Sequence, residues 1–217
     1  MKKNAQASWI QGVAVAGLIA SSAAAQTVVY NNTETPLNSY FASLREFGDQ
    51  ITVSGGGFIA DTFQFEYFAT GLSGGEKATI RFYDNNGAPA GPSNAQSPGE
   101  ILWISPEFPI ANGNFPITIT DLRDLNIALP ASFTWTVRTT GVTDGEVFGL
   151  KLYDPPTVGS SLDDIWRFGN DGWELVQIPG STANFGALLV AVPEPSVGAL
   201  LGLGGLALLL CRRSQGR

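Results

Sequence analysis

Four segments of the chain alternate apolar and polar residues with the period of a β-strand. In the first of them Phe63, Phe65 and Tyr67 fall on one face, and polar residues fall on the other. Such alternation is typical of antiparallel strands that have one buried and one solvated face. The four segments are 62–67, 77–82, 133–138 and 148–152.

Six further segments have weaker strand patterns, and turn signals separate the strands. Sequences such as Gly74-Gly75 and Asp144-Gly145 favour tight turns. About ten strands with regular turns and no long helix predict an all-β domain, an antiparallel β-sandwich of jelly-roll-like or immunoglobulin-like type. The six segments are 27–30, 50–53, 101–105, 117–120, 173–178 and 185–190.

One short helix is expected between the first two strands. Residues 36–47 start with Pro36, which is favoured at the first helical position, and Thr35 is a suitable N-cap. We find no internal repeat and no sign of a second domain, so residues 26–191 are expected to form one β-sandwich domain.

The first 25 residues have the three parts of a secretory signal peptide. Lys2 and Lys3 precede an apolar stretch at 10–20, which would form a helix, and Ala23 and Ala25 supply small residues at the −3 and −1 positions. We therefore expect the export machinery to recognise this segment and signal peptidase to cleave it after Ala25. An uncleaved membrane anchor is the alternative, but the run is short and rich in alanine.

The other end of the chain carries a second apolar segment. The sequence Pro-Glu-Pro at 193–195 precedes fifteen apolar residues at 197–211, and Arg212 and Arg213 follow. As a helix this run would be about 22 Å long at 1.5 Å per residue, shorter than the roughly 30 Å hydrocarbon core. A single transmembrane helix at 197–211 would therefore anchor the protein only weakly in the membrane. The arginines would lie on the cytoplasmic side and the body outside.

This tail resembles the PEP-CTERM sorting signal of Gram-negative bacteria. The resemblance implies that residues 192–217 are processed by a membrane enzyme called exosortase, after transient anchoring in the inner membrane, and that the body then reaches the cell surface or the extracellular space. Proteins with this tail commonly occur in bacteria that make exopolysaccharide. A permanent single-pass anchor remains the alternative. The residues that carry the resemblance are Pro193, Glu194, Pro195, Arg212 and Arg213.

Charge and composition exclude several functions for the body. Residues 26–191 contain seven Lys or Arg against eighteen Asp or Glu, a net charge of −11. Such a surface repels nucleic acid, and it also disfavours direct attraction to an anionic polysaccharide. The chain has no histidine, and its one cysteine, Cys211, lies in the tail. Triads that use histidine, zinc sites that use imidazole, and disulfides are therefore not expected in the body.

The segment 154–173 is the most unusual part of the body, because it has little strand pattern and is rich in polar and aromatic residues. Trp166 and Trp173 could serve as platforms for sugar rings, with Asp163 and Asp164 as hydrogen-bond acceptors. The simpler interpretation is a loop that packs Trp166 over the end of the sandwich. Asp163, Asp164 and Asp171 could also supply oxygens to Ca²⁺, although their spacing matches no known calcium loop.

These observations favour a non-catalytic exported protein of the cell surface or extracellular matrix, associated with the exopolysaccharide layer, without a cofactor or a metal. A carbohydrate-binding module that uses Trp166 and Trp173 is the first alternative. A glycoside hydrolase or lyase is the second. Glycoside hydrolysis needs only two carboxylates at a suitable separation, and the sequence marks no such pair.

Overall fold

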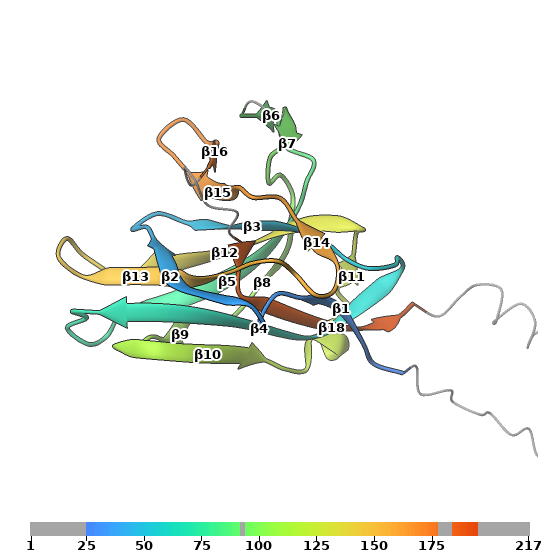
Figure 1. Ribbon diagram of the computed structural model, residues 1–217, viewed down its shortest axis with the longest axis horizontal. Coiled ribbons are helices and arrows are strands. Elements are labelled where there is room, and N and C mark those ends of the chain that lie inside the picture. Colours follow the sequence, from blue (N-terminus) through green and yellow to red (C-terminus); the bar gives the residue numbers. More distant parts are fainter. Residues whose placement is uncertain (1–24, 92–93, 178–183, 195–217) are drawn as a thin grey trace, which may run out of the picture.

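Two eight-stranded sheets face each other in the computed structural model, which describes residues 25–91, 94–177 and 184–194 (Figure 1). Adjacent strands in both sheets are antiparallel. This architecture confirms the predicted all-β class with two antiparallel sheets, as in a β-sandwich. No helix within these described ranges is long and apolar enough to cross a membrane. The predicted signal helix at 1–25 and the segment 197–211 lie outside them, except for residue 25.

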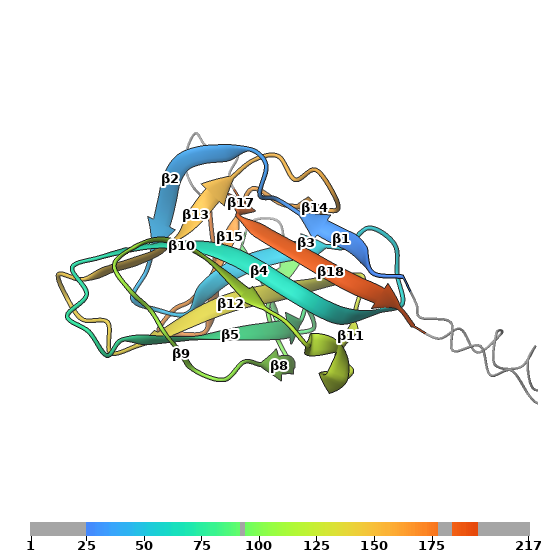
Figure 2. The same cartoon turned by 90° about the horizontal axis from the view of Figure 1, so that it is seen from below.

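The first sheet contains the strand that leads to the C-terminal tail. Its strand order is β1-β18-β4-β13-β17, so that β18 lies between β1 and β4 (Figure 2). Strands β10 and β11 pair with β4, and β2 pairs with β13. The bounds are β1 Thr27–Asn31, β2 Pro36–Ala42, β4 Phe58–Thr70, β10 Gly113–Ile119, β11 Ala128–Leu129, β13 Val147–Tyr153, β17 Asn184–Phe185 and β18 Ala187–Pro193.

The second sheet includes the β15–β16 hairpin, and β6 and β7 form a separate two-stranded sheet. The order of the second sheet is β16-β15-β3-β12-β5-β8, with β14 on β3 and β9 on β5. The β15–β16 and β6–β7 hairpins stand above β3 (Figure 1). The bounds are β3 Phe47–Thr52, β5 Lys77–Asp84, β6 Pro89–Ala90, β7 Ala95–Gln96, β8 Ile101–Ile104, β9 Phe108–Pro109, β12 Ser132–Thr140, β14 Ser160–Ser161, β15 Ile165–Phe168 and β16 Trp173–Val176, with a 3₁₀ turn η1 at Leu122–Leu125.

The core lies between the sheets and is built from the alternating residues. Phe63 and Phe65 of β4 and Trp135 of β12 are fully buried. The rings of Phe63 and Trp135 meet edge to face at 5.1 Å between centroids, and Phe63 meets Phe82 of β5 at the same distance. The four strong strand patterns are thereby confirmed, because in each of them the apolar face points into this core.

The predicted helix at 36–47 is wrong. Residues Pro36–Ala42 form β2, which pairs with β13, and Phe47 begins β3. Asn38 has a φ of 55°, which interrupts any right-handed helix. The segment contains several residues of weak helix propensity, and pairing with β2 satisfies the backbone groups on the edge of β13. The ring of Tyr40 also packs against Phe68, with 4.5 Å between the ring centroids and an interplanar angle of 33°.

One carboxylate lies inside the sandwich. Asp49 is fully buried, on the same face of β3 as Phe47 and Ile51. Its oxygens accept hydrogen bonds from the Ser161 hydroxyl (2.8 Å) and the Phe185 N–H (3.3 Å). Burial raises the pKa of Asp49 well above its ordinary value, because these hydrogen bonds only partly offset the loss of water.

Replacing Asp49 with Asn is expected to stabilise the protein at neutral pH. In the unfolded chain this carboxyl titrates near pH 4, so its contribution to stability is complete below that pH and is lost as the pH rises through the raised folded pKa. The Asn oxygen can accept from the Phe185 N–H, and its NH2 can donate to the Ser161 hydroxyl, which still has the Gln50 carbonyl oxygen as an acceptor (2.9 Å). Both contacts are then kept without a charge. The free energy of unfolding at pH 8 should rise by on the order of 1–3 kcal/mol, and its decline between pH 4 and pH 8 should flatten.

Calorimetric unfolding of both proteins at pH 4 and pH 8 measures this effect. Asp49→Ala is the control, because it leaves the Phe185 N–H unpaired and should be less stable than Asp49→Asn at both values. A lower melting temperature for Asp49→Asn than for the parent at pH 8 would show that the buried charge is stabilising.

Candidate functional site

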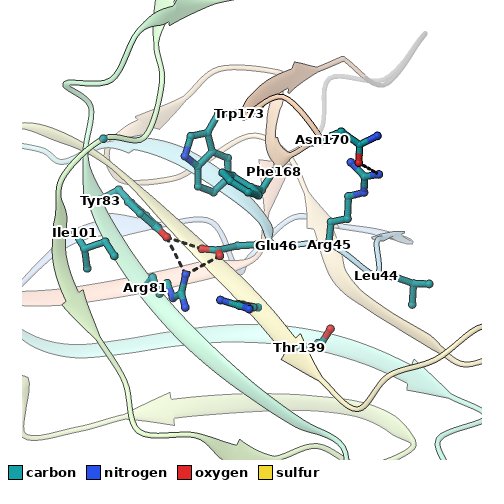
Figure 3. Close-up of a pocket in the computed structure, with 13 residues that line it drawn as sticks. Leu44, Arg45, Glu46, Arg81, Tyr83, Ile101, Thr139, Phe168, Asn170 and Trp173 are labelled. Carbon is teal, nitrogen blue, oxygen red and sulfur yellow. Dashed lines mark hydrogen bonds and ion pairs between the residues drawn. The ribbon is translucent and has the colours of Figure 1, made fainter.

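A cleft of about 660 Å³ opens on the outer face of the second sheet, beneath the β15–β16 hairpin (Figure 3). The inward-facing residues of β5 are Ile80 and Phe82, so their neighbours Arg81 and Tyr83 point outward into the cleft. β12 contributes Arg138 and Thr139, and the residues before β3 contribute Arg45 and Glu46. Three segments that are far apart in the sequence therefore supply the floor of the cleft.

Glu46 is the centre of a hydrogen-bond network on this floor. Its carboxylate accepts hydrogen bonds from Arg81 Nη1 (2.8 Å), the Tyr83 hydroxyl (2.8 Å) and the Thr136 hydroxyl (2.7 Å). The Glu46 side chain is only 8% exposed. A charge that is so little hydrated must be paired and hydrogen-bonded, and the three donors meet this requirement. The network holds Arg81 and Tyr83 in fixed positions.

Tyr83 is a hydrogen-bond donor at neutral pH. Its pKa is raised to about 12, chiefly because the hydroxyl is buried; the hydrogen bond from Arg81 lowers the pKa and the Glu46 carboxylate raises it. A general base works best when its pKa lies near the working pH. Tyr83 is therefore poorly suited to remove a proton from a substrate.

The β15–β16 hairpin places two aromatic rings over the network. Phe168 and Trp173 form the last pair of the hairpin, and their rings meet edge to face at 5.2 Å. Trp173 also meets Tyr83 edge to face at 5.4 Å. The Phe168 N–H donates to the Glu46 carbonyl oxygen (2.8 Å), which connects the hairpin to the floor of the cleft.

The tip of this hairpin is a tight turn that the sequence specifies. Gly169 donates its N–H to the carbonyl of Gly172 at 2.6 Å, and Gly172 has a φ of 119°, which other residues rarely adopt. Arg45 donates to the side-chain oxygen of Asn170 (2.8 Å) and so connects the tip to the segment that precedes β3.

Of the two predicted aromatic platforms, only Trp173 lines the cleft. Trp166 is fully buried on β15, and its indole N–H donates to the side-chain oxygen of Gln50 (3.3 Å). Its ring faces are covered, so the proposed role of Trp166 as a sugar platform is wrong. The segment 154–173 is also not one long loop, because it contains β14 and β15.

The predicted acidic residues do not join the cleft. Asp163 is exposed, whereas Asp164 is 6% exposed, and burial followed by the nearby Asp163 charge raises the pKa of Asp164. Asp171 is exposed at the hairpin tip. In the ranges that the structure describes, no three Asp, Glu, Cys or His side chains form a group that could hold a metal ion. The three aspartates therefore do not assemble into the suggested calcium site.

The C-terminal tail begins inside the first sheet. Val192 is 4% exposed, Pro193 pairs with Phe58, and the Glu194 N–H donates to the Gly57 carbonyl oxygen (2.7 Å). Val192 and Pro193 therefore belong to β18, and Pro193 takes the strand-end position that proline tolerates. Pro195, Arg212 and Arg213 lie outside the described residues, as does Ala23.

Comparison with known proteins identifies the tail. Residues 191–214 match the PEP-CTERM protein-sorting motif, which confirms the resemblance drawn from the sequence. The motif indicates an exported protein with a membrane-anchored C-terminal sorting signal that exosortase processes. Neither the curated proteins nor the solved structures contain a significant match. The motif therefore identifies the sorting signal, and the body must be interpreted from its own geometry.

Proposed function

We propose that this chain is a non-catalytic protein of the cell surface or extracellular matrix, released from the membrane through its sorting motif and associated with the exopolysaccharide layer. The observation that carries the proposal is the direct passage from β18 into the motif at residues 191–214. Among the described residues Glu194 makes the last sheet contact, so cleavage beyond it would keep every described strand in the released body.

The proposed removal of the leader is compatible with the same sheet. β1 begins at Thr27, two residues after the expected cleavage site at Ala25, and Thr27 pairs with Ala191. The two ends of the body thus lie side by side (Figure 2). Both processing reactions would act next to the same edge of the sandwich and leave its strands intact.

The cleft supports binding over catalysis. Among the described residues, Glu46 is the only carboxylate that lines it, and Arg81, Tyr83 and Thr136 all donate hydrogen bonds to that carboxylate. Glycoside hydrolysis requires two carboxylates at the scissile bond. The raised pKa of Tyr83 also disfavours the proton removal on which a lyase depends.

A carbohydrate-binding role is the second candidate, and the position of Trp173 favours it. Trp173 is half-buried at the rim of the cleft, beside the exposed ring of Phe168. Aromatic rings of this kind provide apolar surfaces for sugar rings. In this form the binding module uses Trp173 without Trp166.

Replacing Glu194 with Ala is expected to block release of the protein. The substitution removes the charge from the Pro-Glu-Pro tripeptide and keeps the backbone hydrogen bond to Gly57, so the sandwich should be unaffected. Intact-mass analysis of surface-extracted parent protein should show a chain that starts at Gln26 and lacks Arg212 and Arg213. The variant should stay in the membrane fraction with its C-terminus intact.

Glu174→Ala is the matched control, since it removes another exposed carboxylate of the same kind far from the tail. It should be processed like the parent. Recovery of Arg217 in the surface-extracted parent protein would contradict processing and leave a permanent anchor as the explanation.

A further inference from the structure

The cleft is basic, although the body as a whole is strongly acidic. Arg45, Arg81 and Arg138 line it together with the single carboxylate of Glu46. Three of the seven cations in residues 26–191 are therefore gathered where only one of the eighteen acids lies. Elsewhere the acidic surface would repel an anion, so the local field directs an anionic group towards this cleft.

One of these arginines has side-chain donors that are available to a ligand. Arg138 is exposed on β12, and its guanidinium makes no hydrogen bond or ion pair within the described part of the chain. Arg81 gives one nitrogen to Glu46 and Tyr83, and its Nε is buried, so Arg81 mainly adds positive charge to the floor of the cleft. A guanidinium presents its donors in a planar fork that matches the two oxygens of a carboxylate.

The aromatic side of the cleft adds a second requirement for the ligand. Trp173 points towards Tyr83 and Glu46, and Phe168 lies beside it (Figure 3). Phe168 is 47% exposed, and Ile101 on the opposite rim is 45% exposed. A small inorganic anion would leave this apolar surface uncovered. A pyranose ring would cover it, because its C–H groups pack on aromatic faces.

We propose that the cleft binds a carboxylated sugar, a uronic acid unit of an acidic polysaccharide, with Arg138 on the carboxylate and Trp173 against the ring. The inference rests on the proposed function only in that the body must meet polysaccharide outside the cell. Nucleic acid fits less well, because its closely spaced phosphates would extend over the acidic surface around the cleft.

The uneven distribution of charge changes the expectation that the acidic body does not attract an anionic polysaccharide. A charge of −11 over residues 26–191 disfavours attraction to an anionic polysaccharide when it is spread evenly. The structure shows that it is not spread evenly at the cleft. Binding is therefore expected for one or a few sugar units, such as a chain end, and not along an extended polyanion.

Titration calorimetry of the chain purified from its host tests the proposal. The probes are trimers of galacturonate, mannuronate and glucuronate, with cellotriose and inorganic phosphate for comparison. At least one uronate trimer should bind, and raising the salt concentration should weaken it. Arg138→Gln should weaken that binding about tenfold, because it removes a charge-assisted pair. Since Arg138 is exposed, this variant should fold normally.

Arg123→Gln is the matched control, because it removes the same charge from η1, outside the cleft, and should bind as the parent does. Failure of all three uronate trimers to bind would overturn the inference, and so would equally tight binding of cellotriose or phosphate. An unchanged affinity in Arg138→Gln would also overturn it. None of these results would affect the sorting of the protein, which intact-mass analysis measures separately.

Discussion

Replacing Trp166 with Ala is expected to lower the free energy of unfolding by about 3–5 kcal/mol, the range for a fully buried aromatic side chain. Trp166 has no exposed surface, and the substitution also leaves the Gln50 oxygen without its indole donor. The melting temperature should fall by on the order of 10 °C. Calorimetric unfolding of the purified protein measures both quantities.

Trp173→Ala is the comparison that separates the two tryptophans. Trp173 is half-buried, so its loss should cost about 1–2 kcal/mol, mainly in ring contacts to Tyr83 and Phe168. The effect of this variant should appear instead in ligand binding at the cleft. If Trp166→Ala melted at the parent temperature, its ring could not be packed as the structure shows.

Replacing Gly48 with Ala is expected to destabilise the protein by at least about 3 kcal/mol and to reduce its expression. A Cβ at Gly48 would lie 1.9 Å from the Trp135 carbonyl oxygen and 2.5 Å from the Thr136 Cα. Both are backbone atoms, and Gly48 lies between β12 and β15, which pair with β3 on either side. No side chain can move to make room, so the sheet itself would have to shift.

Gly56→Ala is the control for this prediction. It makes the same chemical change in the 53–57 turn region, where a Cβ would meet nothing within 4 Å. Its melting temperature should equal that of the parent or slightly exceed it, because alanine restricts the unfolded chain. A Gly48→Ala protein that melts within about 2 °C of the parent would contradict the close approach of β3 and β12.

The core was predictable because its signal is local. In residues 62–67 of β4 and 133–138 of β12 every second residue is apolar, and the two-residue period of a strand assigns those residues to one face. Phe63, Phe65, Phe133 and Trp135 are accordingly buried. The alternation does not say which strand is the neighbour of which. The pairing of β18 with both β1 and β4 therefore needed the structure.

The helix error has the opposite cause. Thr35 and Pro36 are good local signals for a helix start, but the partner that decides the conformation is β13, more than a hundred residues away. Similarly, Ile165 and Trp166 are both buried, so β15 shows no alternation that would reveal it as a strand. In both segments a distant pairing overrides the local pattern.

The cleft was only partly visible in the sequence. Trp173 was identified by its unusual surroundings, whereas Glu46, Arg81 and Arg138 were not identified. A usable signal existed, because Arg81 and Arg138 stand on the polar faces of two of the strongest strand patterns in a chain with few cations. The sequence does not show that β5 pairs with β12. This pairing brings Arg81 and Arg138 to the same face of the sheet.

The position of β18 also has a kinetic consequence. β1 is the first strand of the described chain, yet its sheet partner is the last one, with Thr27 opposite Ala191. Contacts between such distant segments close large loops, and proteins that depend on them fold slowly. During transport β1 and β4 would have unpaired edges until β18, which lies near the C-terminal end, is also translocated. We expect an exported chain of this design to need protection from aggregation until that late closure.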